Sequence, residues 1–144
     1  MPIQSGTVPV ERLWRIVAKR ALLATGTEER PLVFGGNDIP GVMMAGAMRS
    51  YLNRYAISPG TATAIFTTND SGYALAQDLE ARGIPLAAII DSREQGHSGY
   101  DGKARLIRGG VVANAKGGKA LSAIEIYANG RSENLNVDAL AMSG

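Results

Sequence analysis

The chain has 144 residues, of which 45% are hydrophobic and 19% are charged, and its formal net charge is +2 at pH 7. This length suits one globular domain, and the composition excludes a disordered chain. Because the chain has no cysteine, disulfides, Cys-ligated zinc and iron–sulfur clusters are excluded. The absence of a dense Lys/Arg cluster argues against nucleic acid as a partner. No apolar run is long enough to span a membrane and residues 1–20 show no signal peptide, so we expect a cytoplasmic protein.

The first third of the chain is expected to hold short strands and one helix. Residues 12–17 alternate between polar and apolar side chains, which is typical of a half-exposed strand. Residues 21–24 read as a second, apolar strand that runs into Thr25 and Gly26. The apolar spacing over residues 41–55 predicts an amphipathic helix. One face of that helix would consist of Val42, Ala45, Met48, Leu52 and Tyr55.

Residues 61–91 have the pattern of a βαβ unit. Residues 61–66 are rich in β-branched and apolar side chains, as in a buried strand. A helix then ends at Gly83, since a C-terminal glycine tolerates a left-handed conformation. Residues 86–90 are continuously apolar, as expected of a parallel strand covered on both faces. With Asp91 closing that strand, this is the outline of a dinucleotide-binding unit.

The turn after the first strand keeps the spacing of the fingerprint G-x-G-x-x-G but only one of its glycines. The three glycine positions fall on Thr67, Asn69 and Gly72. Gly72 lets helix and strand pack closely, and Asn69 tolerates a left-handed conformation better than most residues. Asp91 follows Thr67 by 24 residues, near the ~20 expected of a ribose-binding acid. The turn therefore either binds a nucleotide with a degraded phosphate cradle or is kept only for its shape.

Beyond this unit, a long polar loop leads into a region of predicted strands. The loop spans residues 92–103 and contains His97, the one histidine of the sequence. We expect His97 to be solvated, because a metal site needs several convergent ligands. Asn129-Gly130 is a strong hairpin signal, so the last third is expected to be a small antiparallel β-meander. Its strands are predicted over residues 105–112, 120–128 and 135–142.

Several short motifs are distributed over nearly the whole chain. The most specific is the combination of Leu22–Gly26 with Glu29–Phe34. The others are Asn37–Asp38, Pro40–Met43, Tyr51–Arg54, Phe66–Asp70, Val111–Gly117 and Asp138–Gly144. Together these motifs resemble the α subunits of heterotetrameric sarcosine oxidases. They are also similar to the α subunits of opine oxidase, hydrogen cyanide synthase and dye-linked proline dehydrogenase.

The resemblance implies a piece of a longer α subunit with a glutathione-reductase-like α/β fold. Residues 1–60 would supply partial strands, the Ala-Thr-Gly turn and a connecting helix of an adjoining dinucleotide domain. Residues 61–144 would be a Rossmann-like nucleotide-binding module with the β-meander. The other oxidase subunits and the rest of the α subunit would be its partners. Because such enzymes demethylate sarcosine oxidatively with flavins, the resemblance implies an oxidoreductase fragment that does not oxidise amines alone.

As a nucleotide-binding module, the chain is expected to bind NAD, with FAD or ATP as alternatives. Asp91 would accept a hydrogen bond from a ribose hydroxyl, although Arg93 nearby leaves NADP open. Asp70 would be unfavourable beside pyrophosphate and suits a helix cap better. The expected contacts at this turn are Thr67, Thr68, Asn69, Gly72, Asp91 and Arg93. Thr25 and Gly26 would lie beside a nucleotide on the adjoining domain.

Two other functions compete with nucleotide binding. As a structural module, the βαβ unit would be a scaffold with a vestigial site, and exposed apolar surface such as residues 32–34 would dock other subunits. A free-standing enzyme is disfavoured, because no nucleophile–base pair, metal cluster or intact phosphate loop can be read. We therefore assign no catalytic residue and no metal ligand.

Overall fold

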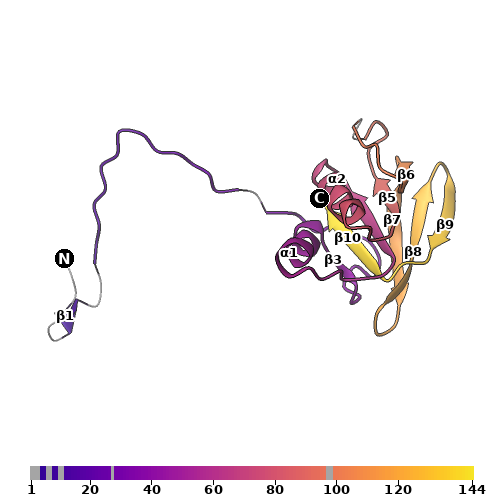
Figure 1. Ribbon diagram of the computed structural model, residues 1–144, viewed down its shortest axis with the longest axis horizontal. Coiled ribbons are helices and arrows are strands. Elements are labelled where there is room, and N and C mark those ends of the chain that lie inside the picture. The colour runs from indigo at the N-terminus through magenta and orange to yellow at the C-terminus, as the bar shows by residue number, and fades with distance from the viewer. Residues whose placement is uncertain (1–3, 6–7, 10–11, 27, 97–98) are drawn as a thin grey trace.

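The computed structural model describes residues 4–5, 8–9, 12–26, 28–96 and 99–144. Its body has three layers, with a five-stranded parallel sheet in the middle. Both helices cover one face of this sheet and a three-stranded antiparallel sheet covers the other (Figure 1). His97, expected in a solvated loop, lies outside the described residues.

The parallel sheet has the strand order β3-β10-β4-β5-β6, so the last strand of the chain lies inside it. Its strands are β3 (Val42–Met44), β4 (Thr63–Thr67), β5 (Leu86–Asp91), β6 (Arg105–Arg108) and β10 (Ala139–Ser143). The helices are α1 (Ala45–Tyr55), which follows β3, and α2 (Ser71–Ala81), which follows β4. The antiparallel sheet consists of β7 (Val111–Gly117), β8 (Leu121–Ala128) and β9 (Arg131–Leu135). Near the N-terminus, β1 (Gln4–Ser5) pairs with β2 (Val8–Pro9).

Alternating side chains of the parallel strands build one core on each face of the sheet. Ile65 of β4 and Ile89 of β5 belong to the core shared with the helices. Ala64, Phe66 and Ile90 belong to the core shared with the antiparallel sheet. Burial on both faces explains why these strands are continuously apolar in sequence. The predicted α/β arrangement with a β-meander is therefore confirmed.

The predicted helix over residues 41–55 begins later than expected. Val42–Met44 pair with β10 instead, because these residues lie beside a strand that the local pattern could not place. Met48 and Leu52 are buried as predicted, whereas Tyr55 is 64% exposed. β3 lies in the same sheet as the strands of residues 61–144, and α1 lies in the same layer as α2. The domain boundary expected at residue 60 stays a prediction.

Two of the three strands predicted in the last third are wrong in extent. Residues 105–112 are divided at Gly109, whose φ of 62° turns the chain from β6 into β7. Residues 135–142 leave the meander after Leu135 and join the parallel sheet as β10. Asp138 directs this change, since its carboxylate accepts the backbone N–H of Thr61 at 2.9 Å and of Ala62 at 2.8 Å. These bonds place the start of β10 beside the start of β4.

The two strands predicted near the N-terminus are also wrong. Residues 12–26, called the arm below, form no helix or strand and extend away from the body (Figure 1). A strand needs a partner for its backbone groups, and the described residues offer none to the arm. Its apolar side chains are consequently bare: Trp14 is 70% exposed and Leu22 is 93% exposed.

Candidate functional site

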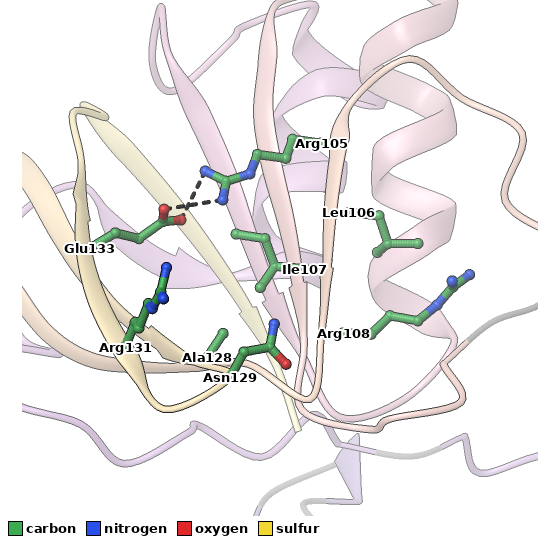
Figure 2. A pocket seen from close by; sticks show the side chains of 8 residues that line it. All are labelled: Arg105, Leu106, Ile107, Arg108, Ala128, Asn129, Arg131 and Glu133. Carbon is green, nitrogen blue, oxygen red and sulfur yellow. Dashed lines mark hydrogen bonds and ion pairs between the residues drawn. The ribbon is translucent and has the colours of Figure 1, made fainter.

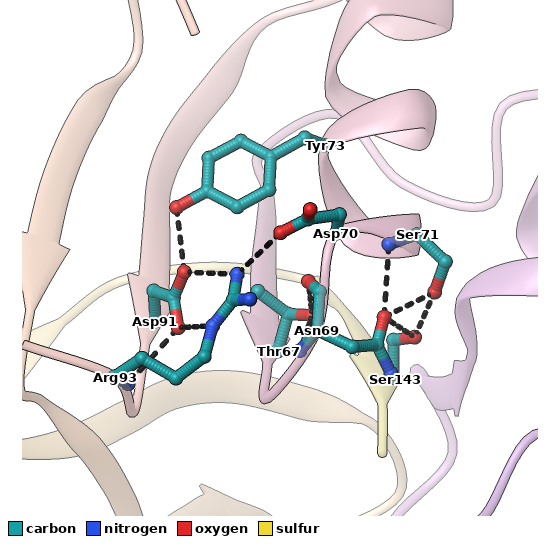
Figure 3. Close-up of polar contacts among 8 residues, drawn as sticks. All are labelled: Thr67, Asn69, Asp70, Ser71, Tyr73, Asp91, Arg93 and Ser143. Carbon is teal, nitrogen blue, oxygen red and sulfur yellow. Dashed lines mark hydrogen bonds and ion pairs between the residues drawn. The ribbon is translucent and has the colours of Figure 1, made fainter. Parts of the chain in front are cut away.

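The carboxyl ends of three neighbouring parallel strands meet where α2 begins (Figure 3). Thr67 ends β4, Asp91 ends β5 and Ser143 ends β10, and these residues are in register across the sheet. In open α/β sheets, ligands bind outside the carboxyl ends of the strands. The N-terminus of α2 adds a positive dipole end to the same place. This edge is therefore the candidate functional site.

The turn between β4 and α2 is held by its own side chains. The Thr67 hydroxyl donates to the carbonyl of Asn69 at 2.7 Å and accepts the Asn69 N–H at 3.2 Å. Asn69 Oδ1 accepts the backbone N–H of Ser71 at 2.8 Å and also its hydroxyl. Such side-chain bonds to the backbone two residues on are characteristic of Asn. Asp70 holds the N-cap position of α2, as expected, but its side chain makes no capping bond. Asn69 Oδ1 makes the side-chain bond to the first N–H of the helix instead.

Gly72 allows α2 to lie directly against the end of β4. A Cβ at this position would stand 2.7 Å from Thr67 Cβ and 2.8 Å from Thr67 Oγ1. Real Cβ atoms do not approach that closely, so any side chain would push the helix from the strand. The position therefore requires glycine for the close helix–strand packing that the fingerprint assigns to it.

Asp91 is a fully buried carboxylate whose oxygens are both engaged (Figure 3). Oδ2 accepts the Tyr73 hydroxyl at 2.7 Å and Arg93 Nη2 at 2.9 Å. Oδ1 accepts the backbone N–H and Nε of Arg93, each at 3.0 Å. Burial by itself raises the pKa of Asp91, but these hydrogen bonds and the charge of Arg93 outweigh it, so the pKa is lowered. Asp91 stays ionised and its lone pairs are taken.

Arg93 is the group that this strand end presents to solvent. Its side chain is 37% exposed, and Nη2 also pairs with Asp70 at 2.7 Å. Hydrogen bonds to Asp91 and then to Asp70 raise the pKa of Arg93 further, so it is always charged. The positive charge of Arg93 is paired with the carboxylates of Asp70 and Asp91. It therefore attracts an anionic ligand only weakly.

Comparison with known proteins gives this edge a family context. No family model matches the chain. The alpha subunit of sarcosine oxidase from Rhizobium meliloti (strain 1021) is 68% identical over 137 residues, which cover 95% of this chain and 14% of that protein. The chain is a homologue of one segment of the sarcosine oxidase alpha subunit. The same subunit of Corynebacterium sp. (strain U-96) is 41% identical over 147 residues, covering 93% of the chain and 15% of the protein.

More distant relatives agree with this placement. An opine oxidase subunit of Agrobacterium tumefaciens (strain Ach5) is 33% identical over 81 residues, which cover 56% of the chain and 16% of that protein. The chain thus spans only 14 to 16% of the length of these relatives.

Solved structures confirm the fold class. L-proline dehydrogenase from P. horikoshii has a TM-score of 0.61 at 23% identity, covering 88% of this chain and 21% of that one. An FAD-dependent pyridine nucleotide-disulphide oxidoreductase from Desulfovibrio vulgaris has a TM-score of 0.60 at 16% identity, and the match covers 81% of this chain and 32% of that one. The chain therefore has the glutathione-reductase-like fold class that the resemblance implied.

The remaining residues predicted to contact a nucleotide divide into two groups. Thr68 belongs to the turn, where its N–H donates to the Ser143 carbonyl at 2.9 Å. Thr25 and Gly26 lie on the arm, and nothing approaches within 4 Å of the Cβ position of Gly26. Two residues of this edge were not predicted from the sequence: Tyr73 reaches Asp91 from the first turn of α2, and Ser143 arrives through the register of β10 with β4.

A basic cavity of about 440 Å³ lies elsewhere, between β6 and the β8–β9 hairpin (Figure 2). There the guanidinium of Arg105 is paired with Glu133 at 2.8 Å, so part of the positive charge is already neutralised. None of the residues discussed at the carboxyl ends of β4, β5 and β10 lines this cavity. The lining residues are Arg105, Leu106, Ile107, Arg108, Ala128, Asn129, Arg131 and Glu133.

The described part of the chain contains neither a metal-binding cluster nor a membrane-spanning helix. No three His, Cys, Asp or Glu side chains gather there as a metal ion would require. Of the helices found in the same residues, none combines the length and apolar character needed to cross a membrane.

Proposed function

We propose that the edge formed by β4, α2 and β5 binds a dinucleotide, NAD in preference to NADP, within a sarcosine oxidase-like oxidoreductase. The observation that carries this proposal is the turn of Thr67, Asn69 and Gly72, which sets the N-terminus of α2 at the carboxyl end of a central parallel strand. Backbone N–H groups and the helix dipole favour a pyrophosphate at such a position.

The turn fits a pyrophosphate with one adjustment. Asn69 Oδ1 now accepts the Ser71 N–H that a phosphate oxygen would take. Asn69 carries no charge, and turning its side chain away gives up the bonds that Oδ1 accepts from the N–H and hydroxyl of Ser71 and from the Ser143 hydroxyl. Phosphate oxygens replace Oδ1 as the acceptor of these bonds. The hydroxyl of Ser71 lies beside the same amide and can donate to the phosphate.

The ribose end of the proposed ligand depends on Arg93. Asp91 has no oxygen free for a ribose hydroxyl while Arg93 covers it, so Asp91 acts first as the residue that positions Arg93. The guanidinium edge and the partly exposed Asp70 carboxylate then face the adenosine half. Because Asp70 and Asp91 together offset the charge of Arg93, a 2′-phosphate gains little there, and NAD is favoured over NADP.

The chemistry of the whole oxidoreductase is proposed to lie outside these residues. In this proposal the chain alone does not oxidise amines. In this proposal the other parts of the enzyme, including flavins, supply the oxidation, and this module contributes a bound nucleotide.

Calorimetric titration of the chain with NAD tests the proposal. Separate titrations with NADP, ATP and FAD show whether one of these nucleotides binds more tightly than NAD. Asn69→Asp places a negative charge at the α2 N-terminus while keeping an oxygen for the cap. We expect it to weaken NAD binding roughly tenfold through repulsion of the pyrophosphate. Asn129→Asp adds the same charge in the exposed β8–β9 turn and should leave the affinity unchanged. Equal NAD affinities of the two variants would contradict binding of the pyrophosphate at this turn.

A structural module is the second candidate, and the exposed arm favours it. Under that function none of the nucleotides binds to a folded sample, and the apolar side chains of the arm contact another part of the oxidoreductase. Tighter binding of FAD than of NAD would instead support a flavin at the same turn.

A further inference from the structure

Glu29 joins the N-terminus of α1 to the end of β10. Its Oε2 accepts the backbone N–H of Gly46, in the first turn of α1, at 2.7 Å. Its Oε1 accepts the Ser143 hydroxyl at 3.1 Å. The N-cap residue Met44 makes no side-chain capping bond, so the cap of α1 comes from 17 residues upstream of Gly46. We call these two hydrogen bonds the anchor contact.

The first turn of α1 is shaped to receive this carboxylate. A Cβ on Gly46 would stand 2.7 Å from Glu29 Oε2 and 3.4 Å from its Cδ. Glycine inside a helix costs roughly 0.5–1 kcal/mol relative to alanine, and here it leaves space that only the carboxylate fills. The absence of a side chain at Gly46 thus makes room for the Glu29 carboxylate in the anchor contact.

Ser143 connects the anchor contact to the candidate nucleotide turn. Its hydroxyl is fully buried and lies 2.6 Å from the Ser71 hydroxyl and 3.3 Å from Asn69 Oδ1. The Glu29 carboxylate is therefore one serine hydroxyl away from the atoms that cap α2. Ser143 thus contacts both Glu29 and the N-terminal residues of α2.

The segment that carries Glu29 is the link between the body and the arm. Arg30 exchanges two backbone hydrogen bonds with Gly144, of 3.4 and 3.2 Å. Leu32 packs against the core under the antiparallel sheet. Residues 12–26 beyond it extend away from the body. The position of the arm relative to the candidate site therefore depends on a short run of contacts that includes Glu29.

We propose that the anchor contact of Glu29 couples nucleotide binding at the α2 turn to the docking of residues 28–32 on the body. This inference rests on the proposed function. A pyrophosphate at the turn takes hydrogen bonds from the Ser71 and Ser143 hydroxyls, which removes the donor that Glu29 uses. Its negative charge also repels the Glu29 carboxylate in a partly buried place. Ligand binding loosens the anchor contact, and by reciprocity a loosened anchor contact strengthens binding.

NAD titration of Glu29→Gln tests the coupling. Glutamine keeps the length and an acceptor oxygen for the Gly46 N–H, but it removes the charge. We expect NAD to bind roughly fivefold more tightly to this variant, at the lower end of common coupling strengths. Glu28→Gln makes the same change on the exposed neighbouring residue and should leave the affinity as it is in the unaltered chain.

Amide hydrogen exchange measured by NMR distinguishes coupling from a purely structural role of Glu29. If Glu29 were only structural, NAD would not change the exchange of the amides near it. In the unaltered chain, NAD should accelerate exchange of the Gly46 and Arg30 amides. Measurable NAD binding with an unchanged affinity in Glu29→Gln and unchanged exchange would overturn the coupling alone. Weaker binding to Glu29→Gln would overturn it as well, because Glu29 would then contact the ligand. A folded chain that does not bind NAD would overturn both the coupling and the proposed function.

Discussion

At the scale of single residues, Asp91 keeps a charge inside the body because Tyr73 and Arg93 donate to both of its oxygens. In Asp91→Asn, an amide group would face those donors with N–H groups of its own. We expect this variant to lose about 3 kcal/mol of the free energy of unfolding at neutral pH, as when one partner of a buried ion pair is removed. Urea denaturation measures the loss. Asp38→Asn, on an exposed loop residue, should change it by less than ~0.5 kcal/mol.

The same carboxylate makes stability depend on pH. Burial raises the pKa of Asp91, but the bonds from Arg93 and Tyr73 and the charge of Arg93 lower it overall. A lowered pKa in the folded state stabilises the protein above the unfolded value of ~3.9 and ceases to do so as the pH falls through the folded value. We expect urea midpoints to fall more steeply below pH ~4 for the unaltered chain than for Asp91→Asn. Parallel curves would contradict this prediction.

At the scale of elements, the contact between α2 and β4 depends on Gly72. In Gly72→Ala the added methyl group meets Thr67, and the helix must move. We expect a loss of roughly 1–3 kcal/mol in the free energy of unfolding, as for other overpacked sites. Gly118→Ala is the matched control, because nothing lies within 4 Å of its Cβ position. Equal stability of the two variants would show that the helix shifts without cost.

The end of α2 fixes the loop that follows β5. Glu80 Oε1 accepts the Tyr100 hydroxyl at 2.7 Å and the backbone N–H groups of Lys103 at 2.9 Å and Ala104 at 3.1 Å. Burial, followed by the hydrogen bond to Glu80, raises the pKa of Tyr100 to about 12.

Glu80→Ala should therefore release this loop. We expect the Lys103 and Ala104 amides to exchange about tenfold faster, since each loses a bond worth about 1 kcal/mol or more, and the pKa of Tyr100 to fall. Hydrogen exchange and an ultraviolet titration of the tyrosines measure the two effects. Glu125→Ala, which removes an ion pair of the meander, should change neither.

Helices and strands could be predicted from the sequence where the local residue pattern determines them. The predictions were wrong where pairing with strands distant in sequence determines the element. The unit from β4 to β5 is visible because its periodicity, Gly83 and Asp91 are all local signals. β10 has an apolar pattern that suits either sheet, and its place in the parallel one depends on pairing with residues distant in sequence, including the bonds of Asp138 with Thr61 and Ala62. At the site, Asn69 and Asp91 could be found by spacing. The role of Tyr73 depends on the packing of α2 against the end of β5, and that of Ser143 depends on the register of β10 with β4.

At the scale of the whole molecule, the arm adds exposed apolar surface without adding to the core. Because Leu13, Ile16 and Val17 are all at least 74% exposed, removing residues 1–27 should change the free energy of unfolding by less than ~0.5 kcal/mol. It should also reduce self-association at high concentration, since bare apolar segments adhere to one another. Thermal unfolding and light scattering of both forms measure these effects. A large loss of stability would show that the arm packs on the body.

The position of β10 has a consequence for synthesis on the ribosome. A nascent chain that has reached Asp138 already contains every other strand of the parallel sheet, yet β3 and β4 lack the strand that joins them. Both then present unpaired backbone edges to solvent, which is where misassembly starts. Completion of the sheet is thus deferred to β10, and a chaperone that shields those two edges would protect this chain more than one that shields the meander.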